Sequence, residues 1–72
     1  MKLVNLKEAR VERNLRQKDI AAYLYKPVAR YSRIETGRVL PTELERILIA
    51  RIVNVEKENI AWPRVNNSRG GK

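Results

Sequence analysis

The 72-residue chain contains no cysteine and no histidine. Without cysteine, neither a disulfide framework nor a thiolate metal site can form. Without histidine, the chain lacks the commonest general base and the commonest metal ligand. A glycine-rich phosphate loop and a pair of carboxylates in an evident pocket are missing as well. The sequence therefore gives little support to an enzyme, and we expect no metal, no cofactor and no small-molecule ligand.

Long apolar runs are also missing. No run approaches the roughly 20 residues that span a bilayer, and the first ten residues, MKLVNLKEAR, lack the apolar core of a signal peptide. We therefore expect a cytoplasmic protein without a membrane contact. Three tyrosines and one tryptophan are too scattered along the chain to form a stacking platform for single-stranded nucleic acid.

Basic residues are abundant, and they are unevenly placed. Sixteen Lys and Arg against eight Asp and Glu give a net charge of +8. Residues 2–38 hold ten basic and four acidic residues, a net of +6, whereas residues 43–72 hold six and four, a net of +2. A positive field concentrated in one half of the chain favours a polyanionic partner over a merely solvated surface.

The hydrophobic pattern predicts an all-α domain of five short helices over residues 1–63, followed by a basic, flexible tail over residues 64–72. Asn5 and Thr42 suit helix N-caps, and Asn14 and Gly37 suit left-handed helix ends. The first expected helix lies between Asn5 and Asn14, and the others cover residues 17–24, 27–36, 43–53 and 56–62. A domain this small has little stability to spare, so a homodimer interface would supplement it.

The stretch from Gln17 to Gly37, QKDIAAYLYKPVARYSRIETG, holds two short amphipathic helices separated by a break at residues 25–27. On the second helix, Tyr31, Ile34 and Glu35 share one side. The other side carries small and basic residues, namely Val28, Ala29, Ser32, Arg33 and Thr36. This is the layout of a helix-turn-helix, in which one helix supports and the next enters a DNA groove. With the positive charge, it makes double-stranded DNA the first partner to expect.

The helix expected over residues 43–53 is apolar almost all round. Its apolar residues are Leu44, Ile47, Leu48, Ile49, Ala50, Ile52 and Val53. A helix of this kind must be covered on more than one side. In so small a domain, the expected cover is a second copy of the chain, which would dock on this helix and the segment that follows it.

Between Leu6 and Val55 the chain resembles the Cro/repressor-type helix-turn-helix regulators of phages and bacteria, the XRE family. The resemblance is carried by L-K-x-A-R at 6–10, N-L-R-Q at 14–17, I-A-x-x-L at 20–24, S-R-I-E-T-G at 32–37, Pro41, and I-A at 49–50. It implies the five-helix fold of that family, a third helix in the major groove, and dimers on two-fold symmetric operators. The chain departs from the family pattern at Tyr25, where glycine is usual.

By this resemblance, Val28, Ala29, Ser32 and Arg33 fall at the positions that reach base edges. Arg33 suits a bidentate contact with guanine O6 and N7, with a phosphate contact or a solvated side chain as alternatives. Val28 and Ala29 suit thymine methyl groups, or they merely leave room for the DNA. Ser32 suits a base or a phosphate.

A second group suits phosphates, which carry affinity without reading sequence, although any one of its members can also be a free surface group. The group comprises Gln17, Lys26, Arg30, Thr36 and Arg38. The resemblance further implies that Gln17 braces the third helix. It also implies an internal ion pair of Arg10 with Glu35, between the first and third helices.

Taken together, these expectations describe a sequence-specific, double-stranded DNA-binding transcriptional regulator in a bacterial cytoplasm or nucleoid. We expect a dimeric, Cro-like repressor that excludes polymerase from a promoter, although the sequence leaves activation open. It equally leaves open a phage Cro, a restriction–modification controller and an excision-control protein. The alternative is an antitoxin-like or other protein-interaction module on the same fold, whose apolar helix holds a partner. Direct RNA binding has no module signature in the sequence.

Overall fold

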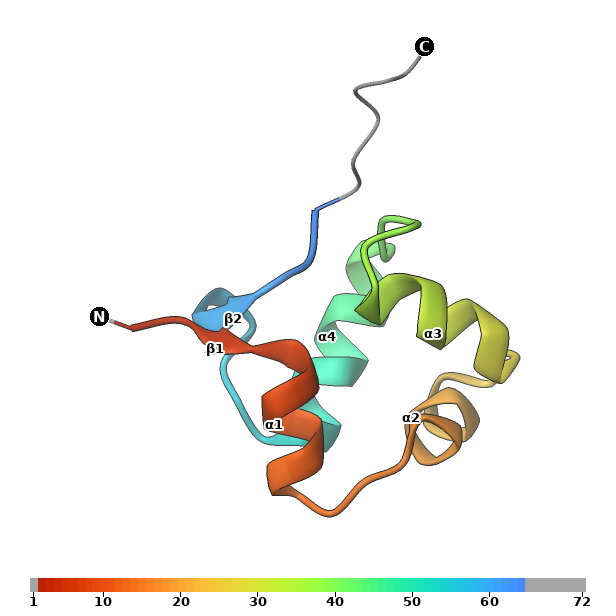
Figure 1. Ribbon diagram of the computed structural model, residues 1–72, viewed down its shortest axis with the longest axis horizontal. Helices are drawn as coiled ribbons and strands as arrows, with labels where there is room; N and C mark the ends of the chain where they lie inside the picture. The colour runs from red at the N-terminus through yellow and green to blue at the C-terminus, as the bar shows by residue number, and fades with distance from the viewer. Residues whose placement is uncertain (1, 65–72) are drawn as a thin grey trace, which may run out of the picture.

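Four α-helices make up most of the structure, a computed structural model that describes residues 2–64 (Figure 1). The elements in chain order are β1 (Val4–Asn5), α1 (Leu6–Glu12), α2 (Gln17–Leu24), α3 (Val28–Glu35), α4 (Glu43–Val53), the 3₁₀ turn η1 (Lys57–Asn59) and β2 (Ile60–Ala61). The expected ranges of the second and fourth helices are confirmed, and α3 lies within its expected range. The fold class is therefore the expected one, a small all-α helix-turn-helix domain.

The first and last α-helices begin where side chains satisfy free backbone amides. The Asn5 side-chain oxygen accepts from the N–H of Glu8 at 3.1 Å, as the sequence predicted. At the start of α4, Thr42 Oγ1 accepts from the N–H of Glu45 at 3.1 Å. Glu45 Oε1 accepts from the N–H of Thr42 at 2.8 Å in return, which completes a capping box.

Each of the four α-helices is followed, within two residues of its end, by a residue in the left-handed conformation. These residues are Asn14, Tyr25, Gly37 and Asn54, with φ of 59°, 58°, 81° and 59°. At the end of α3, the Gly37 N–H donates to the Ile34 carbonyl at 3.2 Å, and the Arg38 N–H donates to the Arg33 carbonyl at 2.7 Å. Such a pair of bonds satisfies two carbonyls that the helix leaves free, and it turns the chain sharply toward the next element.

One set of buried side chains joins the helices and the C-terminal strand. Its members are Leu6, Ala9, Ile20, Ala21, Leu24, Tyr31, Ile34, Ile49, Ala50, Val53 and Ile60. The inward sides expected for α2 and for α3 are thus confirmed. In Figure 1, α4 lies behind α1 and α3, where it supplies three of these core residues.

The α4 helix is covered on one side only. Ile49 and Val53 are buried in the core, but Leu44 is 63% exposed and Ile47 is 37% exposed. Glu45, for which no burial was expected, is 3% exposed. Leu48 and Ile52 are partly buried against the core. Of the seven apolar residues that the sequence showed all round α4, only Leu44 and Ile47 are therefore left as an exposed outer stripe among the described residues.

The fifth helix expected over residues 56–62 is largely wrong. The chain forms only the single turn η1 there, and then β2 pairs in parallel with β1 in the register Val4 with Ile60. The extended backbone at Ile60 (φ −94°, ψ 131°) lets its side chain enter the core. The Trp62 indole N–H donates to the Lys57 carbonyl at 3.0 Å, and Trp62 packs on the core of its own chain. Nonlocal packing thus overrides the weak helical pattern of this segment.

The C-terminal segment then passes beside the end of α3. A Cβ atom at Gly37 would lie 2.8 Å from the carbonyl oxygen of Arg64, so glycine is required there by space as well as by its φ. The basic tail predicted over residues 64–72 lies, apart from Arg64, outside the described residues.

Replacement of Tyr25 by glycine tests the backbone strain in the turn between α2 and α3. A residue with a Cβ pays a steric penalty in the left-handed region, and the Tyr25 side chain is 93% exposed, so it recovers little by packing. We expect Tyr25→Gly to raise the free energy of unfolding by about 1 kcal/mol, measured by urea denaturation. Tyr25→Ala, which keeps the Cβ, should leave it nearly unchanged. Equal stability of the glycine and alanine variants would show that the turn is unstrained.

Candidate nucleic-acid interface

The outer face of α3 carries the side chains that the sequence assigned to base edges. Val28, Ala29 and Arg33 are exposed there, and Ser32 is half-buried. Tyr31 and Ile34 lie on the opposite face of the same helix, fully buried, and hold it to the domain. The helical period alone produces this division, because successive residues turn by about 100°.

A shallow groove of about 330 Å³ runs along this face. It is lined by Ala29, Ser32, Arg33, Thr36 and Arg38. The structure thus brings three of the predicted base-contacting residues together with two of the predicted phosphate-contacting residues. The contacts themselves stay predictions, since no DNA is present.

A buried carboxylate at the last residue of α3 fixes this helix to its neighbours. Glu35 Oε2 accepts from Arg10 Nε at 2.7 Å and from the Tyr31 hydroxyl at 2.9 Å. Glu35 Oε1 accepts from Gln17 Nε2 at 2.8 Å and from Arg10 Nη2 at 3.2 Å. The expected Arg10–Glu35 ion pair is confirmed, and Gln17 does brace α3. One side chain therefore connects α1, α2 and α3.

The charges in this network are held in place by its hydrogen bonds. Burial favours the protonated form of Glu35, but bonds from Arg10, Gln17 and Tyr31 outweigh it and keep the pKa of the carboxyl below its usual value. Burial, and then the bond to Glu35, raise the pKa of Tyr31, so the phenol stays protonated and donates. Glu35 is thus an ionised acceptor at neutral pH.

A second ion pair, which the sequence did not reveal, joins α3 to α4. Arg30 Nη2 lies 2.8 Å from Glu45 Oε1, and Arg30 Nε lies 3.1 Å from Glu45 Oε2. Arg30 Nη2 also donates to the Leu40 carbonyl at 3.4 Å. The spacing of Thr42 and Glu45 was the one available signal, because it is that of a capping box. The phosphate contact predicted for Arg30 stays a prediction, and its guanidinium is already engaged inside the domain.

The other predicted phosphate ligands differ in how free they are. Within residues 2–64, Lys26, Arg33 and Arg38 form no ion pair, and all three are exposed. The Thr36 hydroxyl instead donates to the Ser32 carbonyl at 2.9 Å. Three unpaired cations around α3 therefore leave a positive surface open to an anion.

Two other kinds of site were sought in the described part of the chain. Between residues 2 and 64, no cluster of three acidic, histidine or cysteine side chains is placed to hold a metal ion. No helix in that range has the length and hydropathy needed to cross a membrane.

Comparison with known proteins identifies the family of this chain. A model of the helix-turn-helix family, of the XRE type, matches residues 6–59, a range that includes all four α-helices and η1. No curated protein and no solved structure gave a significant match.

Acid should weaken the fold through Glu35. A carboxyl whose pKa is lowered by folding contributes stability in full above its unfolded pKa of about 4.3, and that contribution is lost as the pH falls through the folded pKa. We expect the free energy of unfolding, followed by urea denaturation from pH 6 to pH 3, to fall steadily below pH 4.5.

Glu35→Gln is the matched variant, because it keeps the shape and removes the charge. Opposite a nearly buried Arg10, it should cost about 3 kcal/mol at pH 7 and should flatten the acid limb of the profile. An acid limb as steep as that of the parent would mean that Glu35 contributes nothing to it.

Proposed function

This chain belongs to the XRE family of helix-turn-helix proteins, which makes it a DNA-binding transcription regulator, and on that premise we propose that it is a dimeric, Cro-like repressor that reads a specific operator. The observation that carries the proposal is the composition of the outer face of α3. That face combines small side chains with Arg33, and Lys26 and Arg38 flank it; none of these three cations has a carboxylate partner among residues 2–64.

Val28, Ala29, Ser32 and Arg33 read bases in this proposal, and Arg33 supplies most of the discrimination. Its guanidinium has no carboxylate partner within residues 2–64, so it can donate two parallel bonds to a guanine. The small size of Ala29 and Ser32 lets α3 approach the floor of the groove.

Gln17, Lys26, Thr36 and Arg38 contact phosphates in the proposal and set the register of α3 on the duplex. Lys26 and Arg38 stand just before and just after α3, so they can hold the two backbones that border the major groove. Thr36 would exchange its bond to the Ser32 carbonyl for a phosphate oxygen. Occupation of a promoter by such a complex excludes polymerase, which is the simplest way for so small a regulator to repress.

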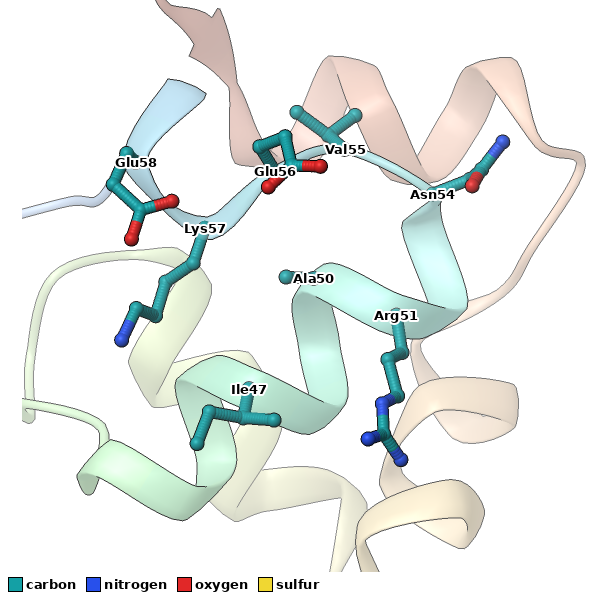
Figure 2. A pocket seen from close by; sticks show the side chains of 8 residues that line it. All are labelled: Ile47, Ala50, Arg51, Asn54, Val55, Glu56, Lys57 and Glu58. Atoms are coloured by element: carbon teal, nitrogen blue, oxygen red, sulfur yellow. The ribbon is translucent and has the colours of Figure 1, made fainter.

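The proposed dimer forms through α4 and the segment that follows it. Leu44 and Ile47 form an uncovered apolar stripe on α4. Beside it lies a groove of about 450 Å³ between α4 and the following segment (Figure 2). The groove is lined by Ile47, Ala50, Arg51, Asn54, Val55, Glu56, Lys57 and Glu58. Arg51, Glu56 and Glu58 among these residues allow two copies to pair opposite charges across a two-fold axis, while Lys57 pairs with Glu43 of its own chain.

The size of the domain suits a two-fold operator. The structure measures 37 × 32 × 20 Å, so equivalent points on two adjoining copies lie up to about two domain widths apart, at twice their distance from the two-fold axis. Half-sites one helical turn apart are separated by about 34 Å. Two copies that touch through α4 can therefore place their α3 helices in successive major grooves.

A binding selection on random duplexes, followed by Arg33→Ala, tests the DNA half of the proposal. We expect the parent to enrich a palindrome with half-sites about 10 base pairs apart. Arg33→Ala should weaken binding to this operator by about 1–3 kcal/mol and relax one base position in a repeated selection. Arg38→Ala should instead weaken operator and random DNA alike. The proposal fails if the parent enriches no site, and Arg33 is a phosphate ligand if its variant behaves like Arg38→Ala.

Sedimentation equilibrium tests the dimer. We expect the double variant Leu44→Gln/Ile47→Gln to raise the dimer dissociation constant by about 100-fold, because it removes buried apolar surface from both copies. Val11→Gln, which replaces a similarly exposed apolar residue on α1, should dimerise as the parent does. A parent that stays monomeric both free and on the operator would contradict the dimer. The exposed α4 surface would then be assigned to binding another protein, as in the antitoxin-like alternative.

A further inference from the structure

We infer that Arg30 and Glu45 form a positioning pair, which sets the placement of α3 on α4 and thereby the fit of α3 to its operator. Arg30 serves specificity through Glu45 and does not act as a phosphate ligand. The inference rests on the proposed function, since it assumes that α3 reads bases.

The geometry of the pair is suited to fixing a helix. The two nitrogens Nε and Nη2 of Arg30 face the two oxygens of Glu45, at 3.1 and 2.8 Å. Because the guanidinium is planar and its donors form a rigid fork, a contact of this kind fixes direction as well as distance. The further contact of Nη2 with the Leu40 carbonyl ties in the loop that joins α3 to α4.

Glu45 is itself immobilised, so it can serve as an anchor. Its side chain is 4% exposed, and it stands at the third residue of α4. Its Oε1 also accepts from the Thr42 N–H at 2.8 Å, within the capping box. The bond from Arg30 lowers the pKa of Glu45 against the opposing effect of burial, so the anchor stays charged. Arg30 is thus bound to the rigid first turn of α4.

The pair gives α3 a second attachment. Glu35 fixes the C-terminal turn of α3 to α1 and α2 through Arg10 and Gln17. Tyr31 and Ile34 also pack α3 against the core, but apolar packing is not directional as hydrogen bonds are. Arg30 holds the N-terminal half, directly beside Ala29 and one turn before Arg33. A bidentate contact with a base tolerates only a few tenths of an ångström of displacement, so the second attachment is needed for reading sequence.

The pair also connects the base-reading face to the proposed dimer face. Glu45 points into the domain, whereas its neighbour Leu44 points outward. The first two turns of α4 therefore hold α3 on one side and would hold the partner subunit on the other. The separation of the two α3 helices in a dimer then depends on the Arg30–Glu45 contact.

A phosphate role through Nε or Nη2 would require this contact to break, and Arg30 would leave a carboxylate that is 4% exposed, which is costly. For these two nitrogens, the two roles therefore predict opposite effects of removing Glu45. A positioning Arg30 loses its anchor, whereas a phosphate-binding Arg30 is released for DNA.

The third nitrogen, Nη1, has no protein partner within residues 2–64 and could donate to a phosphate with the pair intact. In that case Arg30→Gln would lower the salt slope, whereas a positioning role leaves the slope unchanged.

The test measures the dissociation constants of Glu45→Gln, Arg30→Gln and Arg30→Lys on the selected operator and on a random duplex over a salt series. We expect each variant to bind the operator at least tenfold more weakly, with the salt slope of the parent, because the counterions released are unchanged. Arg30→Lys keeps the positive charge and is the least disruptive of the three variants, but it lacks the two parallel N–H donors of the guanidinium. The double variant Arg30→Gln/Glu45→Gln should bind no more weakly than the worse single variant.

Two controls match these changes in charge. Glu43→Gln removes a carboxylate from the same turn of α4, but Glu43 pairs with Arg46 and Lys57 and not with α3. It should leave operator binding unchanged. Arg38→Gln removes a cation that pairs with no carboxylate, so it should lower the salt slope by about 1 and weaken both duplexes alike.

The inference is overturned if Glu45→Gln tightens binding to both duplexes, or if Arg30→Lys binds the operator as the parent does. A parent that distinguishes no operator from random DNA overturns the proposed function and the role in specificity together. Amide hydrogen exchange, which needs no DNA, distinguishes a failure of the proposed function from a failure of the Arg30–Glu45 attachment. Faster exchange in α3 of Arg30→Gln than in Glu43→Gln supports the attachment, and equal exchange overturns it.

Discussion

The carboxylate of Glu35 is the point on which the arrangement of the first three helices depends. It is a charge withdrawn from water, and such a group is stable only when its oxygens are fully bonded. Arg10, Gln17 and Tyr31 supply the bonds, and each comes from a different helix. None of these donors can shift without leaving a buried charge uncompensated. A polar contact thus specifies the angle between helices whose apolar faces alone would pack in several ways.

The α3 helix can then carry two unrelated tasks on opposite faces. Tyr31, Ile34 and Glu35 on its buried face attach it to the domain. The residues of its outer face are therefore not needed for the attachment. Small side chains and Arg33, which pairs with no carboxylate in the described part of the chain, occupy that face, an arrangement that would contribute little to stability. Attachment at Glu35 and at Arg30 is what permits an outer face chosen for a partner rather than for the fold.

Local sequence signals predicted most of the fold. The features that were missed depend on contacts between residues far apart in the sequence, which local patterns do not encode. Caps and a 3.6-residue period are local, so the bounds of α2 and α4 were predictable. The Arg10–Glu35 pair was predictable only through the family resemblance. The burial of Glu45 could not be predicted. A glutamate beside Arg46 in a helix is expected to be exposed unless the position of Arg30 in space is known. The pairing of β1 with β2 joins the two ends of the described chain, which no local pattern encodes.

The distribution of charge is consistent with a dimer face and a DNA face that are separate, as the proposed function requires. Two copies that each carry a net charge of +8 repel each other, and the repulsion is smallest where the charge is lowest. The segment from residue 43 onward has a net charge of only +2 and contains the uncovered stripe of Leu44 and Ile47. The segment from residue 2 to residue 38 has a net charge of +6 and contains α3. In the proposed dimer, an interface on α4 therefore keeps the repulsion between copies small. The strongest positive field would then face the DNA phosphates, whose counterions are released on binding.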